Sequence, residues 1–305
     1  MQSTRGFSAD GLLRKLAKSG KGYLLILPTF ALILVFSYYP FLQALHKSFF
    51  HWDGQSTSFA GLDNYKRMFT GDAELGKAAR NQIVITVVSI LKIVTVPLLV
   101  ARLMFALTSG WATRTYRIML LLPMTVPWIV MGYVWKNMYA PKGVFNTLLA
   151  QLGLDSWAHN WLGDPSMALG SVLFIGFPWA GGIAFLIYLA GFQGIDSSLL
   201  ESARLDGAGF WRRFLAIELP LVQTQTRILL VLTVLDSLKS YGFLIFLTNG
   251  GPAYATLSPG VWIYQNSFVF LRFGYASAIG VVLLLVSALL SWLMIRLTKR
   301  GDLHD

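Results

Sequence analysis

Cysteine is absent from the 305 residues of the sequence, and histidine occurs only four times. The absence of cysteine excludes disulfides, thiolate metal sites and cysteine nucleophiles. No Gly-x-Ser-x-Gly elbow occurs, and the histidines form no zinc-binding pair at helical spacing; they are His46, His51, His159 and His304. Nothing in the sequence therefore indicates hydrolytic or redox chemistry, and we expect no cofactor in this chain.

Charged residues are also scarce. The chain has 25 basic and 14 acidic side chains, is 55% hydrophobic and has a mean hydropathy of +0.59. This composition excludes an ordinary soluble domain and predicts an integral membrane protein. A net charge of +11 would point to nucleic acid in a soluble protein. Here the basic residues gather in loops on one side of predicted membrane helices, so we expect no nucleic-acid partner.

Apolar runs long enough to cross a bilayer occur six times, since a membrane helix needs about 20 mostly apolar residues. They lie at about Tyr23 to Leu45, Ile83 to Leu107, Arg117 to Tyr139, Met167 to Gly191, Leu221 to Leu247 and Ala276 to Leu297. We therefore predict an all-α integral membrane protein with six transmembrane helices. The first run follows several basic residues, as in a signal peptide, but it is too long for a typical h-region, so we expect a retained helix.

The loop charges predict the orientation. Lysine and arginine are concentrated on the side of both termini, which the positive-inside rule assigns to the cytoplasm. This inner set is Arg5, Arg14, Lys15, Lys18, Lys21, Arg114, Arg117, Arg204, Arg212, Arg213, Arg296, Lys299 and Arg300. We expect a cytoplasmic N-terminal segment at 1–22, a transmembrane domain at 23–297 with its core at about 78–297 and a cytoplasmic loop at 192–220, and a cytoplasmic tail at 298–305.

Five further basic residues lie within the predicted spans. Arg102, Lys136 and Arg227 fall near predicted helix ends, where we expect their long side chains to reach the interface. Lys92 and Lys239 lie deeper, and a lysine there is costly unless it faces a cavity or a partner. We interpret Lys92 as a structural residue that pairs with a carboxylate or a backbone carbonyl.

The inner loop from Phe192 to Pro220 is too polar to span the membrane and too patterned for a linker. A short helix is predicted by the spacing of Glu201, Ala203, Leu205 and Ala208. It should end at Gly207 and Gly209, and a second amphipathic segment follows from Trp211 to Glu218. A surface of small side chains with one acidic residue suits docking into a protein groove. An interfacial amphipathic loop fits the same residues.

This loop resembles the cytoplasmic signature of the permease subunits of binding-protein-dependent ATP-binding cassette importers. That signature is Glu-Ala-Ala, three residues, Gly, nine residues, then Ile-x-Leu-Pro. The chain has Glu201-Ser202-Ala203, Gly207 and Ile217-Glu218-Leu219-Pro220 at this spacing and departs only at Ser202. Other stretches resemble the carbohydrate branch, of the larger-subunit maltose and glycerol-phosphate permease type. They are Gly61-Leu62-Asp63-Asn64-Tyr65, Leu122-Pro123 with Trp135, and Leu247-Thr248-Asn249-Gly250-Gly251-Pro252.

The resemblance implies a type I importer permease fold in a bacterial-type cytoplasmic (inner) membrane, and a transport subunit rather than an enzyme. The implied partners are the lipid bilayer, a second permease subunit, two ATPase subunits that bind ATP and magnesium, and an extracytoplasmic solute-binding protein that delivers a sugar. The loop would be a coupling helix seated in an ATPase subunit, and ATP-driven movement of this helix would drive alternating access. The implied coupling residues are Glu201, Ser202, Ala203, Asp206, Gly207, Ala208, Ile217, Leu219 and Pro220.

The fifth predicted span carries a candidate substrate face. Thr233, Asp236, Ser237 and Ser240 recur at i, i+3, i+4 and i+7 and so share one face of a helix. Polar groups at this depth should line a cavity or a helix contact rather than lipid. The resemblance places this face where the family contacts sugar. Asp236 is then a candidate acceptor for sugar hydroxyls, and Trp179 is a candidate stacking partner.

Other interpretations remain open at this point. In one alternative Asp236 pairs with Lys239 one turn away, and in another it packs against the partner permease. An ion-coupled secondary carrier is the alternative function, supported by the deep Lys92, Asp236 and Lys239, although such a carrier has no reason to present a docking helix. A membrane enzyme lacks a catalytic constellation. Within the importer reading, the substrate is a mono- or oligosaccharide or a glycerol-phosphate derivative.

Overall fold

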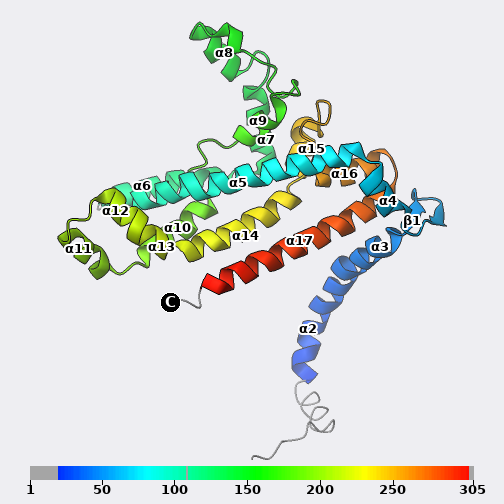
Figure 1. The fold of residues 1–305 in the computed structure, drawn as a ribbon, viewed down its shortest axis with the longest axis horizontal. Helices are drawn as coiled ribbons and strands as arrows, with labels where there is room; N and C mark the ends of the chain where they lie inside the picture. Colours follow the sequence, from blue (N-terminus) through cyan, green and yellow to red (C-terminus); the bar gives the residue numbers. More distant parts are fainter. Residues whose placement is uncertain (1–19, 108, 302–305) are drawn as a thin grey trace, which may run out of the picture.

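The computed structural model describes residues 20–107 and 109–301 (Figure 1). The segment 1–19, with part of the predicted inner set of basic residues (Arg5, Arg14, Lys15 and Lys18), lies outside the described residues, as do residues 302–305 of the predicted tail.

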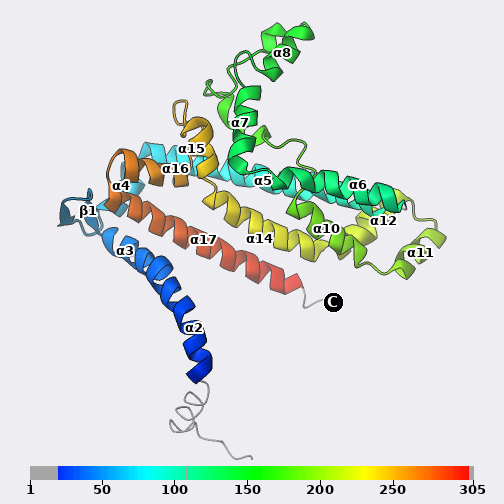
Figure 2. The ribbon, with the colours of Figure 1, turned by 180° about the vertical axis from the view of Figure 1, so that it is seen from behind.

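Three long helices form the centre of the fold: α5 (Ala73–Phe105), α14 (Gln223–Lys239) and α17 (Phe273–Gly301). They run side by side in both views (Figures 1 and 2). The 33 residues of α5 extend about 50 Å at 1.5 Å per residue, more than the bilayer core requires. The shorter α10 (Ile183–Gln193) packs against both α5 and α14.

The first span leads away from this bundle (Figure 1). It consists of α2 (Gly20–Ile33), the π-helical turn η1 (Leu34–Tyr38) and α3 (Tyr39–Lys47). Every residue from 22 to 43 is exposed, although the segment is strongly apolar. An apolar helix without cover from its own chain has to be covered by lipid or by another subunit.

A small hairpin follows the first span. Strands β1 (Phe50–Trp52) and β2 (Thr57–Phe59) pair antiparallel, with His51 opposite Ser58, and α4 (Asp63–Thr70) comes next. This two-stranded sheet is an addition to the predicted all-α architecture. We call this end of the bundle the hairpin end.

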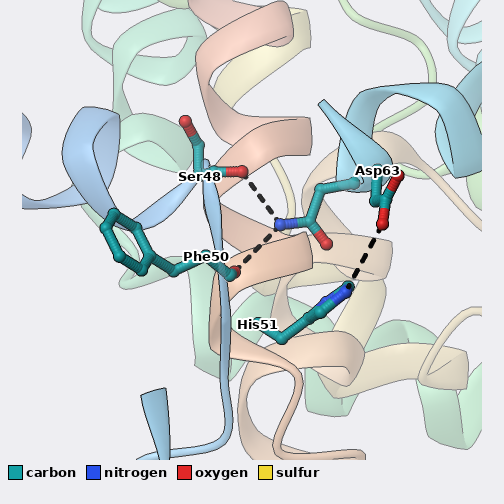
Figure 3. A network of polar contacts seen from close by, with 5 residues as sticks. Ser48, Phe50, His51 and Asp63 are labelled. Atoms are coloured by element: carbon teal, nitrogen blue, oxygen red, sulfur yellow. Dashed lines mark hydrogen bonds and ion pairs between the residues drawn. The ribbon is translucent and has the colours of Figure 1, made fainter. Parts of the chain in front are cut away.

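A buried asparagine fixes the hairpin. Asn64 is 3% exposed, and its amide nitrogen donates to the backbone carbonyls of Ser48 at 2.9 Å and Phe50 at 3.0 Å. Figure 3 shows these two bonds beside the contact between His51 and Asp63, which lie 4.0 Å apart on the exposed side. Asn64 belongs to the Gly61 to Tyr65 stretch that the sequence singled out. Its role here is to satisfy carbonyls where α3 passes into the hairpin.

Asp72 joins three helices at the same end. Its carboxylate accepts the backbone N–H of Leu75 at 2.7 Å and so caps α5. The same carboxylate accepts the indole N–H of Trp262 at 2.8 Å and the hydroxyl of Tyr275. Trp262 lies on α16 (Pro259–Tyr264) and Tyr275 on α17, so one carboxylate holds α5, α16 and α17 together.

The remaining elements form the sides and the opposite end. After α5 come α6 (Gly110–Leu121), η2 (Leu122–Thr125), α7 (Trp128–Met138), α8 (Val144–Gln151), η3 (Asp155–Trp157) and α9 (Ala168–Phe174). After α10 come α11 (Ser197–Leu205), α12 (Phe210–Arg213), η4 (Phe214–Glu218) and α13 (Leu219–Leu221). Between α14 and α17 lie α15 (Gly242–Thr248), α16 and η5 (Gln265–Val269). We call the end that carries α11 and α12 the elbow end; it lies opposite the hairpin end (Figures 1 and 2).

In the described part of the chain, three helices are long and apolar enough to cross a membrane, and up to six spans result if each of three bent helix pairs is one span. This number agrees with the prediction of six spans. Two of the bent pairs differ from the predicted spans, however, because they join α10 to α11 and the segment α12–α13 to α14, and so reach into the predicted cytoplasmic loop. The third predicted span bends by 90° between η2 and α7, at Pro127, because the residue before a proline avoids the helical region.

The fourth and fifth predicted spans are also broken. Between α9 and α10 the backbone takes positive φ at Gly176, Trp179 and Gly182, a conformation that ends helices. The fifth is divided after Lys239, since α15 begins only at Gly242. Non-helical backbone at membrane depth is tolerated where it lines a cavity, and both breaks lie beside one.

Two separate apolar clusters form the core. One lies at the hairpin end and includes Leu244, Leu257, Val261, Trp262 and Ile279. The other lies at the elbow end and includes Leu98, Phe185, Tyr188, Phe192 and Phe214. Both contain fully buried side chains, and α5 runs past both.

Candidate functional site

A cavity of about 780 Å³ lies between the two apolar clusters; its lining is mostly apolar, and Lys92, Asp236 and Lys239 are the charged side chains in it. It is lined by α5, by the irregular segment between α9 and α10, and by α14 with the break that follows it. Its volume falls in the range of small-molecule sites. The breaks in the fourth and fifth spans therefore open onto a space that a small molecule can fill.

All five substrate candidates from the sequence line this cavity: Trp179, Thr233, Asp236, Ser237 and Ser240. Their placement on one face of the fifth span is correct up to Lys239, where α14 ends. Ser240 lies just past the helix, with φ −82° and ψ 72°. The structure thus brings the candidates together but presents the last of them from irregular backbone.

Ser237 is the least available of the five. It is 6% exposed, its hydroxyl lies 2.9 Å from the hydroxyl of Thr86, and it donates to the carbonyl of Val234 at 2.8 Å. Its own carbonyl accepts from the amide of Gln82 at 3.1 Å. These bonds join α14 to α5, so Ser237 holds together the two helices that line the cavity.

Lys92 and Trp179 form the opposite side. The Lys92 ammonium donates to the carbonyl of Leu173 and lies 4.7 Å from the centre of the Trp179 ring, a cation–π contact. The interpretation that Lys92 pairs with a backbone carbonyl is confirmed. The Trp179 indole N–H donates to the carbonyl of Ile175 at 2.9 Å, which fixes the ring despite the positive φ of 55° at this residue. Lys92 also lines the cavity.

Asp236 and Lys239 both line the cavity and are exposed within it. Ion pairs between described side chains occur at His51–Asp63 and Arg102–Glu218 only. The alternative that Asp236 pairs with Lys239 is therefore wrong, although the two lie one turn apart. Their charged groups are left facing the cavity.

We call the segment from α11 to α13 the elbow, and it begins with a capped helix. The Asp196 carboxylate accepts the backbone N–H of Ser198 at 2.9 Å, and hydrogen bonds from Ser198 hold the pKa of Asp196 below its ordinary value. On α11, Glu201 and Ser202 are exposed, whereas Ala203 is 7% exposed and packs inward. The predicted short helix is present, with its acidic residue on the outside.

The end of α11 depends on Gly207. Its φ is +73°. The backbone N–H of Gly207 donates to the carbonyl of Arg204 at 3.0 Å, and the backbone N–H of Ala208 donates to the carbonyl of Ala203 at 2.9 Å. This is the Schellman arrangement, which favours glycine at the left-handed position. Asp206 is exposed beside it. The predicted stop at Gly207 is confirmed, and it turns the chain sharply toward α12.

The second half of the elbow is buried more deeply than the sequence indicated. Ile217 and Leu219 are half-buried, and only Pro220 of the last three implied coupling residues is exposed. Between them Glu218 is 1% exposed and bonds to Arg102. The expectation that Arg102 reaches the interface was wrong, because it is 3% exposed. A signal was present: one arginine in the last turn of an apolar helix and one acidic residue in an apolar motif.

Among the described residues, no group of three or more histidine, aspartate or glutamate side chains is placed to hold a metal ion. The polar groups instead collect in the central cavity and at the elbow. Bent apolar spans around a cavity with charged side chains in its wall are the arrangement expected of a membrane permease.

The chain belongs to the family described as binding-protein-dependent transport system inner membrane component, whose match covers residues 93–301. It is 32% identical to the diacetylchitobiose uptake system permease protein NgcF of Streptomyces coelicolor over 89% of this chain and 81% of that protein. It is 31% identical to the sn-glycerol-3-phosphate transport system permease protein UgpA of Agrobacterium fabrum over 91% of this chain and 94% of that protein.

The fold matches that of a solved permease. A chain of a bacterial alginate ATP-binding cassette transporter, in complex with alginate pentasaccharide-bound periplasmic protein, superposes with a TM-score of 0.83 over 95% of this chain and 97% of that chain, at 22% identity. The chain is accordingly a permease subunit of a sugar importer, a transport component rather than an enzyme. Family membership also argues against the alternative of an ion-coupled carrier.

Proposed function

We propose that this subunit imports a sugar by alternating access and that α11 passes the ATP-driven movement into the membrane. The geometry of the elbow supports this proposal. The helix α11 stands at the end of the bundle (Figure 1), and Glu201, Ser202 and Asp206 are exposed on it. Within residues 20–107 and 109–301, Glu201 forms no ion pair, so its carboxylate is available to an arginine of a partner.

The proposed partners are a second permease subunit, two ATPase subunits that bind ATP and magnesium at the elbow end, and an extracytoplasmic binding protein at the hairpin end. The relatives' names, which include uptake and transport systems, support this assignment. The elbow carries Arg204, Arg212 and Arg213, and basic residues favour the cytoplasmic side. The elbow end and both termini are therefore cytoplasmic in this proposal.

The proposed substrate path runs through the central cavity. Asp236 offers a charged acceptor for sugar hydroxyls, and Trp179 offers an aromatic face for a sugar ring. The cavity also presents Lys92 and Lys239, which suit a phosphate or carboxylate on the sugar. The substrate class is a mono- or oligosaccharide or a glycerol-phosphate derivative. The substrate can be identified by measuring the thermal shift of the cognate binding protein across a panel of neutral and acidic sugars.

Reversing the charge at Glu201 tests the proposed coupling. In vesicles containing the assembled importer, Glu201→Lys should reduce ATP-dependent uptake by about tenfold or more, because removing one partner of a desolvated interfacial charge pair costs about 2–5 kcal/mol. The same variant should retain less ATPase subunit during purification of the permease.

The matched control is Asp155→Lys, which makes the same charge change at an exposed position far from the elbow. It should keep the ATPase subunits. Full uptake and full ATPase retention in Glu201→Lys would contradict the coupling role of α11.

A further inference from the structure

Arg102 and Glu218 form a buried ion pair at the elbow end. Their side chains are 4% and 1% exposed. The arginine donates from Nη2 to Glu218 Oε1 at 2.8 Å and from Nε to Oε2. This is the bidentate geometry that fixes a guanidinium and a carboxylate in one mutual orientation.

The surroundings of the pair are apolar and aromatic. The guanidinium lies 5.0 Å from the centre of the Phe210 ring and 5.8 Å from that of Phe105. Phe105 in turn stacks on Phe192 at the end of α10, with ring centres 6.0 Å apart. Water is excluded from both charges, so each needs the other. Neither residue faces the exposed surface that we assign to docking.

The two residues belong to different structural elements. Arg102 is in the last turn of α5, and Glu218 is the last residue of η4, in the second half of the elbow, which leads into α14. This ion pair therefore attaches the elbow to α5, among apolar contacts such as that of Phe214 with the elbow-end cluster.

The same helix α5 also forms a wall of the central cavity. Ser89, Lys92 and Ile93 line it, and Lys92 lies ten residues before Arg102, about 15 Å along the helix axis. The helix is continuous between them, through Pro97. A displacement of the elbow that is transmitted to Arg102 is thereby delivered to the residues that face the substrate space.

We propose that the Arg102–Glu218 pair is the positioning link that makes the elbow and α5 move as one body during the transport cycle. The proposal rests on the proposed coupling through α11 and adds the route by which movement of α11 reaches the cavity. Removing the link leaves ATPase docking intact, since Glu201 and its neighbours are untouched, but lets the elbow move without α5.

A distance measurement tests the link directly. The chain has no cysteine, so Ser197→Cys on α11 and Leu99→Cys on α5, both exposed, carry the only two spin labels in this subunit of the assembled importer. With the native pair we expect one narrow distance distribution, unchanged between the nucleotide-free and ATP-bound states. With Glu218→Gln, which preserves shape but removes the charge, we expect a broadened distribution that shifts with ATP.

Transport provides the second readout. Glu218→Gln should lower the number of sugars moved per ATP hydrolysed by about 5- to 150-fold, the range of ordinary coupling between sites, while ATP hydrolysis and ATPase retention stay near native values. Arg102→Lys keeps the charge but loses the bidentate fork and should be intermediate. The exchanged pair Arg102→Glu with Glu218→Arg should recover much of the native ratio. Arg114→Gln, an exposed arginine at the same end, is the control and should behave as native.

The outcomes separate the two proposals. If Glu201→Lys has no effect but Glu218→Gln broadens the distance, the link stands and the docking role of α11 fails. A distribution that is unchanged in Glu218→Gln overturns the link. So does a parallel loss of assembly, hydrolysis and uptake in Glu218→Gln and in Arg102→Lys, because that pattern indicates a structural role alone.

Discussion

At the scale of single residues, Asp236 is a carboxylate in an apolar span with no basic partner among the described side chains of its own chain. It faces a cavity of about 780 Å³ rather than hydrocarbon, where an acidic side chain is costly. Trp179 and Lys92 line the same space and are already held by the carbonyls of Ile175 and Leu173. Hydrogen bonds within the chain thus hold Trp179 and Lys92 in place, whereas the carboxylate oxygens of Asp236 are free to accept hydrogen bonds.

Replacement of Asp236 by asparagine tests its proposed contact with sugar. Hydrogen bonds to charged groups contribute about 1.5–3 kcal/mol, so we expect the KM for sugar uptake to rise about tenfold or more in Asp236→Asn, with little change in ATPase retention. The measurement is ATP-dependent uptake at varied substrate concentration. Thr224→Val changes an exposed residue of the same helix outside the cavity and should keep the native KM, and a native KM in Asp236→Asn would remove this residue from the substrate site.

The sequence predicted where these residues lie when the type of side chain and its spacing along a helix pointed to the same place. A polar face at helical spacing located the cavity wall, and the deep lysine indicated a carbonyl partner, which Leu173 supplies. The side chains whose role depends on a distant segment were not predicted. Arg102 was expected at the interface, but Glu218, 116 positions away, holds it in the interior. Each residue stands out locally as a single charge in an apolar segment, but the local sequence does not specify that the two pair with each other.

At the scale of elements, helix α17 begins under a tight constraint. Gly274 lies so close to strand β1 that a Cβ there would overlap the carbonyl oxygen of Phe50 and crowd the backbone nitrogen of Trp52. Glycine is required here by close approach of two backbones rather than by its own φ. The contact seats the hairpin on the first turn of the last span.

Alanine substitutions in α17 test this seating. Gly274→Ala should destabilise the protein by about 1–3 kcal/mol, the usual cost of overpacking, and should lower the thermal unfolding temperature measured in detergent. Gly280→Ala is the matched control, because it lies in the same helix with no atom within 4 Å of a new Cβ. It should be neutral or stabilising, by up to about 1 kcal/mol. Equal unfolding temperatures in the two variants would contradict the proposed contact.

Hydropathy predicted the positions of the spans, but it does not show where a span is interrupted. Hydropathy located each apolar stretch because burial in lipid depends on composition. It missed the interruption between α9 and α10 and the one after Lys239, because an apolar sequence reads the same whether it forms one helix or two short ones around a cavity. Gly176 and Gly182 take positive φ values in this region, which glycine permits but does not require.

At the scale of the whole molecule, the proposed orientation places the elbow inside and the hairpin outside. Because the chain has no cysteine, one engineered thiol reports on one site. Leu205→Cys, at a residue that is 89% exposed in the elbow, should react with a membrane-impermeant maleimide only after the cytoplasmic side is opened. Gln55→Cys, exposed in the hairpin turn, should react in intact cells. The reverse pattern would invert the topology and would remove α11 from reach of ATPase subunits.

The separation of the apolar core into two clusters has a mechanical consequence. Each cluster is packed tightly and resists deformation, whereas the region between them holds the cavity, two helix breaks and few buried side chains. The molecule is therefore stiff at both ends and compliant in the middle. We therefore expect any change in the width of the cavity to come from that middle region, because it disturbs fewer packed side chains there than within either cluster.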